Sequence, residues 1–108
     1  MAIPHAQPGE VIDVRPLGLA VATTPTATLV KTPTLEVIRL SLPAGKTIPE
    51  HKVAGEITVQ CLEGEVRFTA AGKTQALTAG KLLWLSGHEP HALTAVSDAS
   101  VLVTILLH

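Results

Sequence analysis

The chain has 108 residues and a net charge of −1; 46% of its residues are apolar and 16% are charged. This length is typical of one domain, and the apolar content excludes intrinsic disorder. The chain has no Lys/Arg cluster and only two aromatic residues, Phe68 and Trp84, which excludes a nucleic-acid surface built on charge or base stacking.

The first residues lack the basic-then-apolar layout of a signal peptide, and no apolar run approaches the roughly 20 residues that span a bilayer. We therefore expect a soluble cytosolic protein with no membrane or nucleic-acid partner. The single cysteine, Cys61, excludes an intrachain disulfide and is expected to be a small buried side chain. A small chain with so few charges also favours a homodimer.

Short apolar runs separated by Gly and Pro predict strands along the whole chain. We expect them at residues 11–14, 19–23, 35–42, 57–62, 65–70, 74–78, 82–85, 91–96 and 101–107. Val66 and Phe68 alternate with Arg67 and Thr69, which is the pattern of a half-buried strand. Turn signals recur about every eight to twelve residues, which is typical of a β-sandwich or barrel. The sequence thus predicts an all-β protein.

Two of these strands raise further expectations. Residues 101–103 and 105–107 are apolar at every position, which fits either a strand enclosed by the barrel or one packed against a second subunit. Trp84, in the predicted strand 82–85, is expected in the core.

Two segments hold the candidate functional residues: Gly45, His51 and Gly64 in the first, and Gly80 and His91 in the second. Their order and spacing resemble the two motifs of the cupin superfamily. The resemblance covers about residues 35–107 and implies a double-stranded β-helix, or jelly roll, of the RmlC-like cupin type. Residues 1–108 then form one cupin domain, with N-terminal strands and an arm in 1–34 and the motif-bearing barrel in 35–107.

In cupins with complete motifs, two His and one Glu of the first motif and the His of the second bind a divalent metal inside the barrel. Here Val53 and Ile57 occupy the second His position and the Glu position. Two of the four ligand positions, His51 and His91, are therefore kept, and the resemblance implies one divalent transition metal bound to them. Two imidazoles are fewer than the three protein ligands that catalytic zinc or non-haem iron usually takes.

Further ligands are expected from Gln60, His88 or Glu56. Glu56 precedes the lost Glu position by one residue, so it needs a β-bulge to turn inward. Gln60 lies on the opposite side of a regular strand from Ile57, and Glu50 likewise from His51, because side chains alternate. His88 is in the turn before His91 and could reach the mouth of the pocket.

Three functions remain open for a pocket at the barrel mouth, between strand 57–62 and the turn before His91. The resemblance implies a metal-dependent, dioxygenase-like enzyme acting on a small molecule, or a metal-free isomerase or epimerase with a histidine general base. The third hypothesis is a non-catalytic module that binds a small ligand or acts as a sensor. Its pocket would be lined by Val53, Ile57, Val59 and Cys61, with the two histidines as polar anchors.

Overall fold

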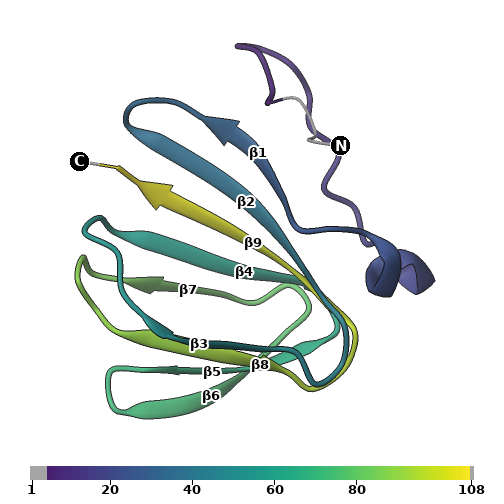
Figure 1. Cartoon of the computed structure of the whole chain (residues 1–108), viewed down its shortest axis with the longest axis vertical. Coiled ribbons are helices and arrows are strands. Elements are labelled where there is room, and N and C mark those ends of the chain that lie inside the picture. Colours follow the sequence, from purple (N-terminus) through teal and green to yellow (C-terminus); the bar gives the residue numbers. More distant parts are fainter. Residues whose placement is uncertain (1–4, 108) are drawn as a thin grey trace.

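The computed structural model describes residues 5–107, shown in Figure 1. Residues 1–4 and His108, which the predicted domain includes, lie outside the described part. The regular structure of residues 5–107 consists of a short 3-10 helix and nine strands. In chain order these are η1 (Gly18–Thr23), β1 (Ala27–Lys31), β2 (Leu35–Leu42), β3 (Thr47–His51), β4 (Ile57–Glu63), β5 (Glu65–Ala70), β6 (Lys73–Thr78), β7 (Leu82–Leu85), β8 (His91–Ala95) and β9 (Ala99–Leu106).

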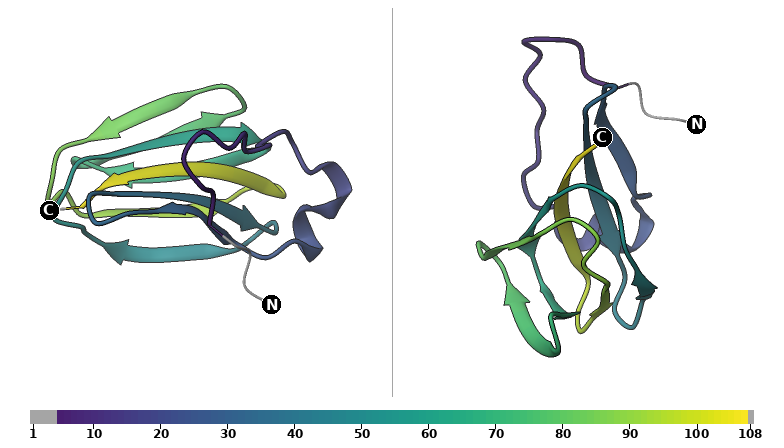
Figure 2. Two further views of the ribbon diagram at one scale, coloured as in Figure 1. Left: turned by 90° about the horizontal axis from the view of Figure 1, so that it is seen from above. Right: turned by 90° about the vertical axis from the view of Figure 1, so that its left-hand side faces the viewer.

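The strands form two antiparallel sheets, a five-stranded one in the order β1-β2-β9-β4-β7 and a four-stranded one in the order β3-β8-β5-β6. Figures 1 and 2 show the two sheets as facing layers that curve toward each other. From β2 to β9 the chain passes from one sheet to the other at every connection except the β5–β6 hairpin, as in a jelly roll. The all-β prediction is confirmed. Helical structure long and apolar enough for a membrane span is not found among residues 5–107.

The core lies between the sheets and follows the alternation of the strands. On β4, Ile57, Val59 and Cys61 are buried between partly exposed neighbours. On β5, Val66 and Phe68 are buried while the residues between and after them are exposed, so the predicted alternation of this strand is confirmed. Each large apolar side chain buried in this way contributes about 1.5–3 kcal/mol to folding.

Two tight turns explain why particular residues stand between the strands. Ala71 and Gly72 have φ of 52° and 77°, the left-handed pair of a two-residue hairpin turn, and join β5 to β6. Gly64, between β4 and β5, has φ of 76°, and a Cβ there would overlap the carbonyl oxygen of Asp98. Only glycine satisfies both constraints at this position.

Arg39 of β2 attaches the N-terminal segment to the outer side of the five-stranded sheet. Its Nη2 donates to the carbonyl oxygen of Val14 at 3.1 Å and to that of Arg15. The guanidinium is largely buried, and its Nε has no hydrogen-bond partner among the described residues.

Glu63 of β4 binds the same N-terminal segment through its negatively charged carboxylate. One carboxylate oxygen accepts from the N–H of Leu17 at 2.7 Å and from the Ser100 hydroxyl, and the other accepts from the N–H of Gly18 at 2.9 Å. Burial alone would raise the pKa of this carboxyl. The hydrogen bonds from Ser100, Leu17 and Gly18, with the charge of Arg39, outweigh burial and hold the pKa below its ordinary value.

The strands predicted before residue 27 are wrong. Residues 11–14 have no regular structure, and residues 19–23 lie in η1. Gly18 adopts φ of 61°, and the Thr24 hydroxyl donates to the Ala20 carbonyl at 2.6 Å, so the chain curls instead of extending. Local side-chain bonds of this kind compete with strand pairing.

The prediction that Trp84 lies in the core is also wrong. Its side chain points outward from β7 and is 59% exposed. The indole Nε1 donates to Oε1 of Glu56 at 3.0 Å, which satisfies its one polar atom at the surface.

Candidate functional site

The structure brings His51 and His91 together. His51 ends β3, His91 begins β8, and the two residues are paired across these neighbouring strands. Their ring centroids are 4.3 Å apart, with the planes inclined by 60°. Two imidazoles from distant parts of the chain therefore meet as neighbours at one place between the sheets.

Main-chain carbonyl groups orient both rings. Nδ1 of His51 lies 3.0 Å from the carbonyl oxygen of Pro49, and Nδ1 of His91 lies 2.9 Å from that of Glu89. A carbonyl oxygen can only accept, so each Nδ1 carries the proton. In the neutral rings, Nε2 is then left with a free lone pair. The site therefore offers two hydrogen-bond acceptors, the Nε2 atoms of two imidazole rings whose tautomers are set by main-chain carbonyl groups.

His91 forms the deeper part of the site and His51 the more exposed part. The His91 side chain is 7% exposed and stacks on Phe68, with centroids 5.8 Å apart and planes inclined by only 9°. Sequence reasoning placed Phe68 on the inward side of its strand but did not connect it with the histidines. The signal was present in part, because the alternation of β5 fixes the inward direction, but the stacking depends on the register between β5 and β8.

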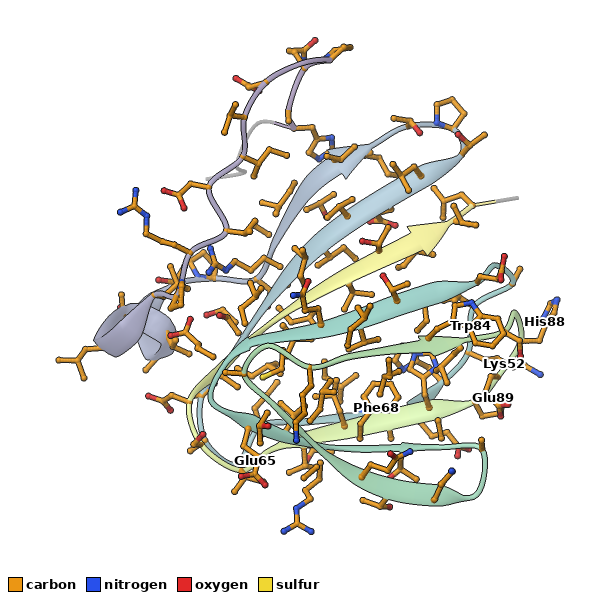
Figure 3. The ribbon with its side chains drawn as sticks, turned by 180° about the vertical axis from the view of Figure 1, so that it is seen from behind. Lys52, Glu65, Phe68, Trp84, His88 and Glu89 are labelled. Carbon is orange, nitrogen blue, oxygen red and sulfur yellow. The ribbon has the colours of Figure 1, made fainter. Side chains whose placement is uncertain are left out.

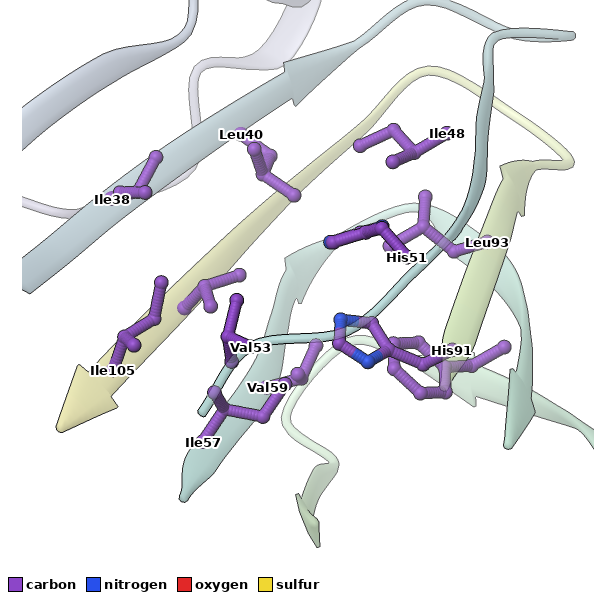
Figure 4. Close-up of a pocket in the computed structure, with 12 residues that line it drawn as sticks. Ile38, Leu40, Ile48, His51, Val53, Ile57, Val59, His91, Leu93 and Ile105 are labelled. Atoms are coloured by element: carbon purple, nitrogen blue, oxygen red, sulfur yellow. The ribbon is translucent and has the colours of Figure 1, made fainter. Parts of the chain in front are cut away.

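The two rings project into a cavity of ≈ 210 Å³ between the sheets, shown in Figure 4. Ten of its twelve lining residues are apolar, and the two histidines are the others. The predicted residues Val53, Ile57 and Val59 line it, joined by apolar side chains of β2, β3, β5, β8 and β9. The wall is therefore almost entirely hydrocarbon around two polar atoms.

Two loops close against each other beside the histidines. The N–H of His88 donates to the carbonyl oxygen of Val53 at 2.8 Å. A Cβ on Gly87 would overlap the carbonyl oxygen of Ala54, so glycine allows this close approach. The contact fixes the loop after His51 relative to the loop before His91.

The predicted additional ligands do not line this cavity. The carboxylate of Glu56 is exposed and accepts from Trp84. Gln60 lies on the outer side of β4, between the inward-facing Val59 and Cys61. His88 has φ of 64° and an exposed side chain at the outer rim of the barrel, as Figure 3 shows.

Cys61 is buried, as predicted, but it does not line the cavity as the binding-module hypothesis expected. Its Sγ lies 3.3 Å from the carbonyl oxygen of Glu63 and 3.5 Å from that of Gly64. Burial raises the pKa of this thiol, and the carboxylates of Glu63 and Glu65 act in the same direction. A protonated, buried thiol is a packing group and a poor nucleophile.

The donor set does not fit a metal centre built on three protein ligands. Among residues 5–107, no group of three or more His, Cys, Asp and Glu side chains is arranged to hold a metal ion. The two imidazoles are accompanied in the cavity by apolar side chains only.

Comparison with known proteins decides the family. The cupin-domain model (Cupin_2) matches residues 38–107, which include both histidines and most of the barrel. The chain belongs to the cupin family. No functionally curated protein matches this cupin.

Solved structures agree on the fold. A conserved protein of unknown function from Streptococcus pyogenes is 22% identical, with a TM-score of 0.76 over 100% of this chain and 96% of that one. A cupin superfamily protein from Desulfitobacterium hafniense is 19% identical, with a TM-score of 0.78 over 95% and 100%. An RmlC-like cupin from Desulfovibrio desulfuricans is 28% identical, with a TM-score of 0.68 over 75% and 79%. The predicted double-stranded β-helix of the RmlC-like type is thus confirmed.

Proposed function

We propose that this cupin binds a small, neutral, mainly apolar molecule that donates a hydrogen bond from a hydroxyl or other donor group to Nε2 of His51 or of His91. One observation carries the proposal. Both imidazoles donate Nδ1–H to main-chain carbonyls, which leaves two acceptor nitrogens in a cavity otherwise lined by hydrocarbon. Each donor hydrogen on the ligand satisfies one of these nitrogens, and the apolar body of the ligand fills the rest of the cavity.

The size of the cavity limits the ligand. An engineered cavity of about 150 Å³ in another protein binds benzene. The present cavity of ≈ 210 Å³ leaves room for a ring of that size with a small substituent. Phenol is therefore a suitable probe, because it combines such a ring with one hydroxyl donor.

The polarity of the wall disfavours a charged ligand. None of the lining residues is Asp, Glu, Lys or Arg. A carboxylate entering the cavity would lose its hydration without meeting a permanent cation, which is unfavourable by several kcal/mol. A neutral hydroxyl loses less and gains a partner on entry.

The arrangement supports binding more than catalysis. A histidine general base is commonly oriented by a carboxylate, whereas both rings here are oriented by main-chain carbonyls. A ligand carrier or sensor needs only the enclosed cavity and its two anchors.

The test compares phenol, benzene and benzoate by isothermal titration calorimetry. We expect phenol to bind best, since it alone matches both the apolar wall and the acceptors. The His51→Phe/His91→Phe double variant keeps two rings but loses both acceptor nitrogens. It should bind phenol about 2- to 10-fold more weakly, as expected for one lost hydrogen bond, because phenol has a single donor hydrogen.

The control for this experiment is His88→Asn, which removes an exposed imidazole outside the cavity and should leave phenol binding unchanged. Benzene binding should differ little between wild type and the double variant. Tightest binding of benzoate, or loss of phenol affinity in His88→Asn, would contradict the proposal.

Metal analysis of untagged protein distinguishes the alternative, a metal-dependent enzyme. We expect no near-stoichiometric transition metal after purification. Stoichiometric metal that disappears in the His51→Phe/His91→Phe variant would replace the binding proposal by the metal-dependent one.

A further inference from the structure

A second cavity, of ≈ 180 Å³, adjoins the one that holds the histidines. Val53 and Ile105, which Figure 4 shows on the wall of the first cavity, line both cavities and therefore separate them. The rest of the second cavity is lined by the loop after Val53, by the end of β9 and by Glu36 near the start of β2. A ligand that extends past Val53 and Ile105 reaches this second cavity.

Glu36 points to the inner side of the five-stranded sheet, where charged residues are rare. Ile38 and Leu40, two and four residues further along β2, line the first cavity. Because side chains alternate along a strand, Glu36 lies on the same face as these two residues. Its side chain is only 20% exposed, and it is the one polar side chain in the lining of the second cavity. A carboxylate thus faces the interior just beyond the hydrocarbon wall.

One oxygen of this carboxylate is left without a partner. Lys31 of β1 lies opposite Glu36 in the strand pair, and its Nζ donates to Oε1 at 3.3 Å. Oε2 accepts no hydrogen bond from residues 5–107. A carboxylate has about four lone-pair sites, so Glu36 can accept a further hydrogen bond without losing Lys31.

Main-chain groups at the edge of the second cavity are already paired. The N–H of Leu106 donates to the carbonyl oxygen of Glu56 at 3.0 Å, and that of Leu107 donates to the carbonyl oxygen of Thr34 at 2.9 Å. These bonds fix the end of β9 to the segments on either side of it. The free oxygen of Glu36 is then the acceptor that a ligand in the second cavity meets on a side chain.

We propose that the second cavity is a subsite for a second hydroxyl, or another neutral hydrogen-bond donor, which donates to Oε2 of Glu36. This inference rests on the proposed function and specifies its ligand: an apolar body with one donor for a histidine Nε2 and another for Glu36. A neutral donor fits better than an ion, because Lys31 already balances the charge of Glu36. An ammonium or carboxylate group would lose hydration and meet an ion pair without net charge.

The test compares pairs of ligands that differ only at the second end: 4-ethylphenol with its terminal alcohol, and 4-propylphenol with its terminal alcohol. The two chain lengths allow for the reach from the first cavity to Glu36. Isothermal titration calorimetry with the wild-type chain should show about 2- to 10-fold tighter binding of the alcohol in at least one pair, as expected for one hydrogen bond. The same alcohol should also shift the amide NMR signals of Gly55 and Leu107 more than its alkyl counterpart does.

Two variants locate the second donor. Glu36→Leu removes the acceptor, so it should bind 4-ethylphenol as wild type does but lose the preference for the alcohol. Lys31→Gln is the matched control, because it breaks the same ion pair yet keeps the carboxylate, and it should retain the preference. The terminal amine of 4-ethylphenol should bind wild type no more tightly than the alcohol.

The outcomes separate this inference from the proposed function. If 4-ethylphenol binds but neither alcohol gains affinity, if the preference persists in Glu36→Leu, or if the amine binds tightest, the subsite is overturned and the proposed function stands. If neither phenol nor the alkylphenols bind the wild-type chain, the proposed function fails and the subsite fails with it.

Discussion

Glu63 shows how one side chain fixes a segment that lacks regular structure. Both of its carboxylate oxygens accept main-chain N–H groups from residues that begin the turn into η1, and one also accepts from Ser100. Charge-assisted hydrogen bonds of this kind are about twice as strong as neutral ones. The negative charge therefore matters to the attachment of the N-terminal segment.

We predict that Glu63→Gln lowers the free energy of unfolding by about 1–3 kcal/mol at pH 7, because an amide donates where only acceptors are needed. Urea unfolding followed by circular dichroism measures the change. Glu50→Gln, at an exposed position, is the control and should shift stability by less than about 0.5 kcal/mol.

The stability difference between wild type and Glu63→Gln should depend on pH, and the lowered pKa of Glu63 sets the direction of the change. The pKa of Glu63 in the folded protein lies below its ordinary value of 4.5. Its contribution is therefore fully present above pH 4.5 and is lost as the pH falls through the folded pKa. The stability difference between wild type and Glu63→Gln should shrink on acidification from pH 5 to pH 3. A constant difference over that interval would contradict this account.

At the scale of elements, the turns set the geometry of the barrel. Gly64 and Gly45 both belong to the cupin motif and both have positive φ, 76° and 88°. A Cβ on Gly64 would overlap main-chain atoms of Asp98 and Ala99, whereas a Cβ on Gly45 would meet open space. A substitution at Gly45 therefore introduces backbone strain only, whereas one at Gly64 introduces both backbone strain and steric overlap.

We predict that Gly45→Ala lowers stability by about 1–2 kcal/mol, the ordinary penalty of a left-handed residue with a side chain. Gly64→Ala should lower it by at least about 2 kcal/mol more, since the β4–β5 turn and the loop before β9 must also separate. Thermal unfolding of the two variants beside wild type measures both changes. Equal losses would show that the contact with Asp98 has no energetic weight.

Strands could be predicted where inward and outward side chains alternate, as in β5, or where turn residues bound a short apolar run, as in β7. Residues 65–70 and 82–85 were placed at the observed bounds of β5 and β7. β1 and β3 were not predicted, because both are sheet edges with weak apolar patterns. β3 also holds Pro49, which a strand tolerates only where its missing N–H is not needed for pairing.

At the scale of the whole molecule, motif spacing predicted the meeting of His51 and His91, because the cupin barrel brings those two motif positions together. The surroundings of the pair could not be predicted in the same way. Phe68 reaches His91 through the register of β5 on β8, and the tautomers depend on carbonyl directions that no side-chain pattern encodes. Whether the pair binds a metal stays a prediction for the metal analysis described above.

The homodimer expected from the sequence would make stability a property of two chains. A partner that binds only the folded state raises the unfolding temperature by mass action. We predict that the unfolding temperature of wild type rises by a few degrees for each tenfold increase in protein concentration. Differential scanning calorimetry over two decades of concentration checks this, and a concentration-independent wild type would argue for a monomer.

The carbonyls of Pro49 and Glu89 have a consequence for how such a pocket can change over time. Because main chain and not side chain directs both imidazoles, no single substitution elsewhere in the wall deletes the groups that aim them. The hydrocarbon lining is then free to vary in shape, one residue after another, while the two lone pairs keep their directions. Evolution or protein engineering can therefore change which molecule fits the cavity without changing the two histidines that bind it.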